Sequence, residues 1–364
     1  MTTEIKFPNW QSRVFLSAVS RRQPICPAAL PRGLVRSLQW YEKRVLKVDE
    51  GTGAVDRPIL LLGMPRSGTT MLQDLLCSHP QVAYINNTMN LFPDCFCAIE
   101  HWRQKLRLDF EGDRYLSDSV SVSASSPSDA VAMWGTWFKL DVYDLRYCPR
   151  TMADFPPPAI DEIHSLLRRV LWCYHGERTR FFNKLLAVMP YIHLVRQIFP
   201  GARFVHIIRD ARNTANSMLK LCRTEIEHQK QMGLGRRDPV KGVQYFISYP
   251  RFEKLSEYVA EFGLDDIRTT AHLWNDEMTY IDSIRGEIPH FYEVRYEDIV
   301  ASPEREIAKL LEFCELSPLD GTCGALRKKI ADVGVLRHSN RYGEFPVVEK
   351  ICGENLRKHG YPAG

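Results

Sequence analysis

The stretch PILLLGMPRSGTTMLQDLL, from Pro58 to Leu76, carries the strongest structural signal in this chain of 364 residues. It opens with a short apolar run without alternation, which is typical of a parallel strand buried on both faces. Gly63 and Gly68 then mark a turn, and the apolar residues after it have helical spacing. A strand, a glycine-rich turn and a helix in this order gather backbone N–H groups and the positive end of the helix dipole around one point. Such a nest binds a tetrahedral anion.

The side chains of this turn indicate which anion it holds. Phosphate loops of ATPases and GTPases follow the pattern GxxxxGK[ST], in which the lysine reaches the β- and γ-phosphates. Here Thr69 stands at the lysine position, so a nucleotide triphosphatase would lack its main phosphate cation. Arg66 supplies a cation earlier in the turn, with a planar fork that matches one edge of a phosphate or a sulfate. With the hydroxyls of Ser67, Thr69 and Thr70, the turn favours a less charged anion held without a metal ion; an ordinary capped helix is the alternative.

A second motif lies in RFVHIIRDARNTANSML, from Arg203 to Leu219. Arg209 follows a predicted buried strand at Phe204–Ile208, at the carboxyl end where α/β folds bind ligands. Ser217 lies eight residues further on, about two turns along the predicted helix. An arginine at a strand end and a serine on the next helix can together bind a second phosphate. The alternative is that Arg209 pairs with Asp210 or another acid and that the serine is an ordinary helix residue.

Further segments predict the same class of fold. A strand near Phe181–Lys184, a helix over Tyr191–Phe199 and the following strand form a pattern typical of a βαβ unit. The order of elements predicts one α/β domain, with the three-layer architecture of P-loop NTPases: a central parallel β-sheet flanked by helices. We expect residues 1–54 to form an N-terminal helical extension, with a helix near Leu34–Lys47, that packs on a core domain of residues 55–364.

Composition excludes several classes of protein. The 48 basic and 44 acidic residues leave a net charge of +4, and no basic run is interleaved with aromatics, so nucleic acid is not predicted as a partner. The longest apolar runs are shorter than a membrane span. The ten cysteines include no CxxC pair, which argues against a zinc site and favours a reduced protein over one with a few disulfides. We expect a soluble cytoplasmic protein without a bound metal; a chain trimmed from a longer anchored protein is the alternative.

Taken together, the two anion motifs resemble the sulfotransferase family, which uses 3′-phosphoadenosine 5′-phosphosulfate (PAPS) as donor. In that family a PRSGTT-type loop binds the 5′-phosphosulfate, and an arginine and a serine after a central strand bind the 3′-phosphate. Both motifs are present here, as Pro65–Thr70 and as Arg209 with Ser217. The segments IFPGARFVHIIRD and YEVRYEDIVASPEREIAKLLEFCEL are also similar to the family, and the resemblance spans roughly Pro58–Cys222 and His290–Leu316.

The resemblance implies a sulfotransferase domain at 55–364 that binds PAPS, releases the desulfonated nucleotide (PAP) and needs no metal. Arg341 would belong to a C-terminal loop that closes over the nucleotide. The implied donor-binding residues are Arg66, Ser67, Gly68, Thr69, Thr70, Arg209, Ser217 and Arg341.

Sulfuryl transfer resembles phosphoryl transfer, in which positioning and electrostatics lower most of the barrier. We expect Arg66, the backbone of Ser67–Thr70 and Lys184 to hold the transferring group and its leaving oxygen. Lys184 ends the RFFNK strand, where related enzymes carry a lysine that contacts this group. Leu185-Leu186 follows it instead of the frequent KxP pattern, and a solvated surface lysine is the alternative.

The general base is the least defined part of the predicted site. Relatives often use a Glu or His soon after the loop helix, where this chain has asparagines. The candidates are Asp94, Glu100, His101 and Asp129. Any one of them is more often a structural residue than a catalytic one.

The acceptor is predicted only as a hydroxyl or amine of a small molecule, lipid, carbohydrate or peptide. The loops in 85–155 and 225–255 are expected to select it; the first contains the serine-rich SDSVSVSASSPSD, which is typical of loops over an active site or of a disordered surface segment. Two other functions remain open. One is a P-loop kinase or NTPase with an atypical loop and Asp210 as magnesium ligand, and the other is an inactive nucleotide-binding protein.

Overall fold

A five-stranded parallel sheet lies at the centre of the computed structural model, which describes residues 9–12, 30–48, 51, 53–113, 121–176, 178–231, 233–239, 242–333 and 344–362. The strand order is β2-β5-β1-β6-β9, and every pairing within this sheet is parallel. In that order the strands span Val82–Tyr84, Arg180–Lys184, Ile59–Leu62, Arg203–Ile208 and Phe291–Arg295. The predicted α/β class is confirmed, and so are the strands expected near 181–184 and 204–208.

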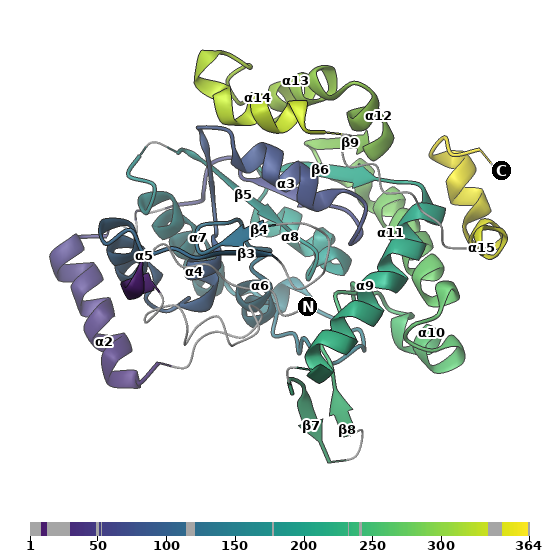
Figure 1. Cartoon of the computed structure of the whole chain (residues 1–364), viewed down its shortest axis with the longest axis horizontal. Helices are drawn as coiled ribbons and strands as arrows, with labels where there is room; N and C mark the ends of the chain where they lie inside the picture. The colour runs from purple at the N-terminus through teal and green to yellow at the C-terminus, as the bar shows by residue number, and fades with distance from the viewer. Residues whose placement is uncertain are drawn as a thin grey trace.

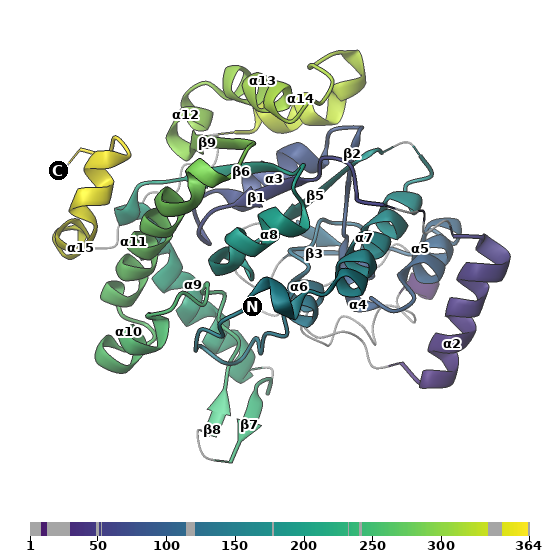
Figure 2. The ribbon, with the colours of Figure 1, turned by 180° about the vertical axis from the view of Figure 1, so that it is seen from behind.

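Helices cover both faces of the sheet, as Figures 1 and 2 show from opposite sides. Ile59 and Leu61 of β1 pack in one hydrophobic cluster, with residues of α3, α13 and α14. Leu60 and Leu62 pack in the other cluster, with residues of α7, α8, α9 and α11. Because both faces are covered, all four β1 residues are buried, which explains the apolar run without alternation. The helices span Thr69–Cys77 (α3), Pro303–Phe313 (α13), Gly324–Ala331 (α14), Pro157–Trp172 (α7), Ile192–Ile198 (α8), Ala211–Gln231 (α9) and Ile267–Ile284 (α11).

The strand order places a topological switch point between β1 and β6. The chain leaves β1 toward β2 on one side of the sheet and leaves β6 toward β9 on the other side. Ligands of open α/β sheets bind in the crevice outside the carboxyl ends of the strands at such a point. Leu62 lies beside His206 in the register, so the turn that begins at Gly63 and the segment at Arg209 leave the same edge of the sheet.

Part of the predicted N-terminal extension packs on the core. The helix α2 (Arg32–Tyr41) runs into a π-helical turn, η1 (Glu42–Leu46), so the helix expected near 34–47 is confirmed. Both elements pack against α5 (Phe96–Lys105). The Glu42 carboxylate is buried there: it accepts from the Ala98 N–H at 2.8 Å and pairs with Arg169 of α7 at 2.6 Å. The boundary of the extension at residue 54 remains a prediction.

Residues 85–155 contain several short helices and strands.

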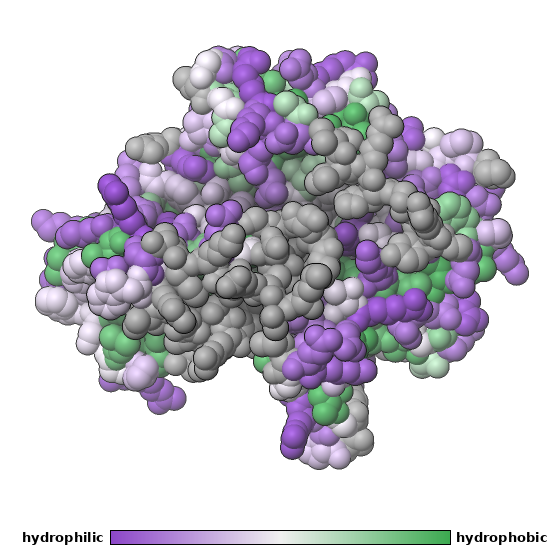
Figure 3. Space-filling model, in the orientation of Figure 1, coloured by the Kyte–Doolittle hydropathy of each residue, from purple (hydrophilic) through white to green (hydrophobic). Residues whose placement is uncertain are grey.

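A hairpin of β7 (Arg236–Asp238) and β8 (Gly242–Gln244) lies outside the central sheet and projects from the end of α9. Figure 3 shows purple hydrophilic residues where this hairpin meets α9. The remaining elements are α4 (Asn87–Leu91), β3 (Glu111–Asp113), β4 (Ser121–Ser123), α6 (Val131–Trp137), α10 (Leu255–Phe262), α12 (Tyr296–Ala301), α15 (Phe345–Lys358) and the 3₁₀ turns η2 (Met152–Asp154), η3 (Met189–Tyr191), η4 (Arg285–Glu287) and η5 (Gly321–Cys323).

The cysteines of the described ranges are free thiols, and most of them are buried. Burial raises the pKa of several of these thiols, for example that of Cys222 to about 12, as expected of small apolar core residues. None of the helices within the described ranges combines the length and apolar character of a membrane span.

Candidate active site

The turn after β1 can be built only with glycine at its two ends. Gly63 has φ +146°, and a Cβ there would lie 2.7 Å from the carbonyl oxygen of Ile207 on the neighbouring strand β6. Gly68 has φ +101°, and a Cβ there would lie 2.5 Å from the ring of Tyr296 in α12. Both contacts are shorter than real Cβ atoms allow, so the turn sits pressed between β6 and α12.

The helix α3 begins immediately after Gly68 and has no side-chain cap. Its first N–H groups therefore lack the usual intrahelical or side-chain acceptor, which makes this end a site for an anion. Ser67, a predicted donor-binding residue, makes hydrogen bonds within the turn itself, and its role in binding the donor remains a prediction. Both its N–H and its hydroxyl donate to the Met64 carbonyl, at 3.1 Å and 2.8 Å, so its donors are engaged within the turn.

The two anion motifs meet at Arg66. This residue has a positive φ of 74°, and its Nε donates to the Ser217 hydroxyl of α9 at 3.0 Å. Its carbonyl oxygen accepts from Nη1 of Arg209 at 3.1 Å. Three residues that the sequence analysis selected from two distant segments are thus in direct contact.

Arg209 lies against an aromatic ring at the end of β6. Its guanidinium stands 4.4 Å from the centroid of Tyr296, the same ring that excludes a side chain at position 68. Its backbone carbonyl accepts from the indole N–H of the buried Trp274 at 3.0 Å. The buried Nε of Arg209 has no hydrogen-bond acceptor among the described residues, so one donor at the site is left for a ligand.

The alternative pairing of Arg209 with Asp210 is wrong. Asp210 instead pairs with Arg212 at 2.6 Å and accepts from the Arg212 N–H at 2.8 Å at the start of α9. Glu297 of α12 accepts from the Asp210 N–H at 3.2 Å and so holds α12 against this helix start. These contacts occupy the carboxylate that a magnesium-dependent enzyme would need as a ligand.

Lys184 lies beside the turn between β1 and α3, and it is not a solvated surface lysine. It ends β5 in register with Leu61 of β1, and its side chain is 3% exposed. Its Nζ lies 2.8 Å from Oδ1 of Asp129 and donates to the Thr70 hydroxyl, on the first turn of α3, at 3.4 Å. The Asp129 side chain is 32% exposed. A buried cation thus joins the anion loop to a carboxylate that solvent can reach.

The segment that carries Asp129 is held from β5. Asn183, the neighbour of the lysine, is fully buried and donates to the Ser128 carbonyl at 3.0 Å. The side-chain carbonyl of Asn183 accepts from the Trp134 indole at 2.6 Å, which attaches α6 to the same point. Ser128 N–H also donates to Ile85 O at 2.8 Å. These contacts fix the backbone on both sides of the carboxylate.

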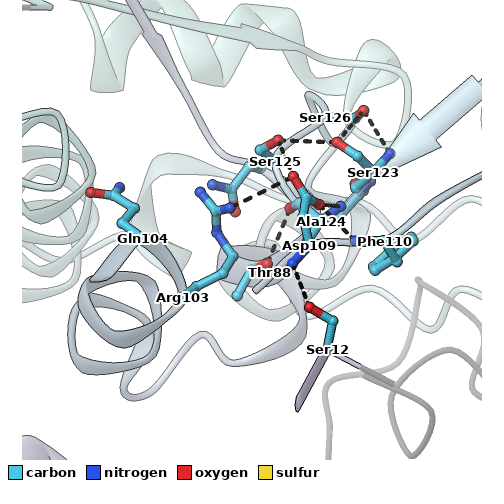
Figure 4. Close-up of polar contacts among 12 residues, drawn as sticks. Ser12, Thr88, Arg103, Gln104, Asp109, Phe110, Ser123, Ala124, Ser125 and Ser126 are labelled. Carbon is cyan, nitrogen blue, oxygen red and sulfur yellow. Dashed lines mark hydrogen bonds and ion pairs between the residues drawn. The ribbon is translucent and has the colours of Figure 1, made fainter. Parts of the chain in front are cut away.

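Hydrogen bonds within and around the serine-rich patch hold the chain just before the Asp129 segment. Asp109 accepts from the Ala124 N–H at 2.9 Å and from the Ser125 hydroxyl at 3.3 Å, as Figure 4 shows. The Thr88 hydroxyl of α4 donates to the Ala124 carbonyl at 3.1 Å. For residues 121–130, the serines therefore form an ordered polar cluster that leads into the Asp129 segment; residues 114–120 lie outside the described ranges.

The other three candidate bases lie on a different part of the molecule, near α2. Asp94 is exposed, and its carbonyl accepts from Gln39 of α2 at 3.1 Å. Glu100 is buried in an ion pair with Arg103 at 2.6 Å, which compensates its charge. Within the described ranges, neither residue makes a polar contact with the anion loop.

His101 shares this location. Its ring lies 6.3 Å from Tyr41 of α2, and burial lowers the pKa of its imidazole. Arg341, the predicted nucleotide-closing residue, falls outside the described residues.

Two residues that contact the candidate site were not among those predicted from the sequence. Tyr296 and Glu297 come from the YED part of the segment that resembles the family, and they contact Gly68, Arg209 and the start of α9. The motif itself was the available signal, but nothing in its local pattern says that it reaches a turn more than 200 residues earlier.

Comparison with known proteins agrees with this geometry. A sequence model of the sulfotransferase family matches residues 58–235 and 234–320. The omega-hydroxy-beta-dihydromenaquinone-9 sulfotransferase Stf3 of Mycobacterium bovis is 24% identical over 331 residues, 85% of this chain and 76% of that protein. Protein-tyrosine sulfotransferase A of Caenorhabditis elegans is 21% identical over 77% of this chain and 55% of its own length.

A solved structure shows the same fold. The crystal structure of sulfotransferase STF9 from Mycobacterium avium aligns with a TM-score of 0.53 at 15% identity, over 89% of this chain and 82% of that one. The family match covers well over half of the residues and includes both anion motifs. This chain belongs to the sulfotransferase family and is an enzyme that transfers a sulfuryl group.

Proposed function

We propose that this enzyme takes its sulfuryl group from PAPS and passes it to a hydroxyl that lies in front of Asp129. The observation that carries the proposal is the buried Lys184, held between Thr70 of the anion loop and the Asp129 carboxylate. This arrangement puts a fixed positive charge and a proton acceptor at the mouth of the same anion site.

The donor would use the whole switch point. The N-terminal amides of α3 and the Arg66 guanidinium suit the 5′-phosphosulfate, because they combine the helix dipole with a cationic fork. Arg209 and Ser217 suit the 3′-phosphate. Arg66 contacts both Arg209 and Ser217, so it lies between the proposed sites for the 5′-phosphosulfate and the 3′-phosphate.

The transfer needs four changes of bonding. The acceptor oxygen forms a bond to sulfur while the bond from sulfur to the bridging phosphate oxygen breaks, and PAP leaves with the electron pair. The acceptor proton passes to Asp129. Lys184 stabilises the charge on the sulfuryl oxygens and the departing phosphate, as fixed cations do in phosphoryl transfer.

The competing functions have less support. A magnesium-dependent kinase or NTPase would need Asp210, which pairs with Arg212, and a lysine where Thr69 stands. An inactive nucleotide-binding protein would not need a carboxylate beside the loop, but Asp129 lies 2.8 Å from Lys184. The cytoplasmic location and the independence from metal remain predictions.

Isothermal titration calorimetry tests the donor. We expect PAP to bind with EDTA present and to bind more tightly than ATP with magnesium. Transfer of ³⁵S from labelled PAPS to an added acceptor should then be unaffected by EDTA. Tighter binding of magnesium ATP, or the absence of any PAP binding, would rule out the proposed donor.

A further inference from the structure

A pocket of about 410 Å³ opens beside Asp129. Small-molecule sites in proteins commonly measure ~300–1,000 Å³ and are mostly apolar with a few placed polar groups. We infer that this pocket receives the acceptor, and that the acceptor is a compact, neutral, largely apolar alcohol or phenol. The inference rests on the proposed function, because it takes Asp129 as the group that accepts the proton.

The walls of the pocket are largely apolar. They come from α6 and the segment after it, from the residues that follow β5, and from the segment after β8. Tyr147 and Tyr191 stack with their ring centroids 5.4 Å apart and an interplanar angle of 14°. Aliphatic and aromatic residues complete the wall, among them Val131, Leu140, Leu186 and Phe246.

Three hydroxyl groups in the wall are engaged in hydrogen bonds within the protein. The Tyr191 hydroxyl donates to the Cys148 carbonyl at 2.8 Å, and the Tyr249 hydroxyl donates to the Leu264 carbonyl at 3.2 Å. The Ser248 hydroxyl donates to Glu225. These hydroxyls are therefore not offered to a polyhydroxylated ligand, and a sugar would lose hydrogen bonds to water on entering.

Most charged groups of the wall are also compensated within the protein; the exposed Lys139 is the exception, with no ion pair among the described residues. Arg146 pairs with Asp144 and Arg236 of the β7 strand pairs with Asp141, each at 2.5 Å. Arg251 donates to the carbonyls of Val142 at 2.6 Å and Ile247 at 2.7 Å, among others. Apart from Lys139, which keeps its contact with solvent, the lining offers no unmatched counter-charge, so the desolvation of a charged acceptor would not be repaid.

Asp129 is the point at which the pocket meets the anion site. Asp129 lines the pocket, and its carboxylate contacts Lys184, which in turn donates to Thr70. The hydroxyl of an acceptor would therefore lie at this end, with its apolar body toward Tyr147 and Phe246. Its proton passes to Asp129 while its oxygen forms the new bond to sulfur, as in the transfer described above.

An acceptor panel tests the class of substrate. With ³⁵S-labelled PAPS, we expect 2-naphthol to give a higher kcat/KM than N-acetylglucosamine or an acidic tyrosine-containing peptide. Faster transfer to the sugar or the peptide would overturn the inference.

A pocket-filling variant tests the location. Ala187 is part of the wall and half-buried, so Ala187→Trp should block the pocket, whereas Ala331→Trp places the same residue on the exposed surface of α14. We expect Ala187→Trp to raise the KM for 2-naphthol about tenfold or more, since overfilling a packed site is unfavourable. The control variant should leave it unchanged, and both should bind PAP like the wild type.

Two readouts separate this inference from the donor proposal. Binding of 2-naphthol, followed by its own fluorescence without donor, should weaken in Ala187→Trp. An unchanged affinity and KM in that variant would overturn the pocket assignment even with PAP binding intact. If the wild type does not bind PAP, the proposed donor is wrong. The binding of 2-naphthol to wild type and Ala187→Trp would still test whether the acceptor occupies this pocket.

Discussion

Two clusters of buried charge lie on the central sheet, and they differ in what surrounds them. Lys184, at the end of β5, pairs with the half-exposed Asp129 and faces a pocket. His206, in the middle of β6, is fully buried between Glu277 of α11 and Glu293 of β9, at 3.4 Å and 3.0 Å. The first cluster is open to a ligand, whereas the second is largely closed by protein, with only Glu293 partly exposed.

The closed cluster has the properties of a structural ion group. Burial by itself would lower the pKa of His206, but the hydrogen bonds to Glu277 and Glu293 outweigh it and raise the pKa to about 9. Glu293 also lies 3.7 Å from His359 at the end of α15. The group of His206, Glu277, Glu293 and His359 therefore joins β6, β9, α11 and α15, and it stabilises these elements next to Arg209. The difference between the two clusters means that a buried charge indicates a catalytic site only where a ligand can reach it.

The largest expected effect is on catalysis, at the open cluster. Asp129→Asn keeps the shape of the side chain but removes the proton acceptor, so kcat should fall by about 10²–10⁴-fold. PAP affinity should change little, whereas the unfolding midpoint should fall, because the buried Lys184 loses its counter-charge. Steady-state transfer of ³⁵S measures the rate, and Asp94→Asn and Glu100→Gln are matched controls. A loss of kcat in either control with full activity in Asp129→Asn would move the base to the α5 region.

The next effect is on stability, at the closed cluster. His206→Ala leaves two carboxylates without their central cation, and removing one partner of a buried ion group costs about 3–5 kcal/mol of unfolding free energy. Urea denaturation measures it. His101→Ala, at a half-buried ring near α2, should cost less than about 1 kcal/mol. A native-like stability of His206→Ala would mean that the cluster does not hold these elements together.

The third effect concerns the donor. Arg209→Ala removes a guanidinium whose buried Nε has no acceptor among the described residues, so its loss should weaken PAP binding by about 10²-fold. Calorimetry with PAP measures the change. Arg223→Ala, at an exposed arginine of α9, is the control and should bind PAP normally. An unaltered Kd in Arg209→Ala would show that the 3′-phosphate is bound elsewhere.

The smallest effect is a pH dependence of the closed cluster. Because the folded pKa of His206, about 9, lies above its ordinary value of 6.5, its contribution is fully present below pH 6.5 and is lost as pH rises through 9. Between pH 7 and pH 9 the wild type should lose roughly 2 kcal/mol relative to His206→Gln. Urea midpoints at several pH values test this. Parallel pH profiles of the two proteins would contradict a protonated His206.

Local sequence patterns predicted the strands and helices next to the site. An unalternating apolar run can persist as a strand only where both faces are covered, and β1, β5 and β6 meet this condition. Gly63, Gly68 and the arginine between them also predicted the anion-binding turn from local sequence, because turn geometry depends on the residue at each position. Lys184 and Arg209 were predictable as residues at strand ends.

The proposed base and the proposed acceptor pocket were not predictable in this way. Asp129 was one of four candidate bases, and nothing in its own segment distinguishes it from Glu100. It becomes special only because Asn183 and Trp134 attach its segment to the end of β5, 2.8 Å from Lys184. The role of Tyr296 likewise depends on α12 returning to the first turn.

The local sequence thus determined the anion loop, its strand and the family, since each depends on residues close together in the chain. Tertiary structure alone decided which acid faces the loop, which charges are closed off and what lines the pocket. The physical reason is that burial, ion pairing and desolvation depend on neighbours in space, and here those neighbours can lie far apart in the chain: Arg66 and Ser217 are 151 residues apart.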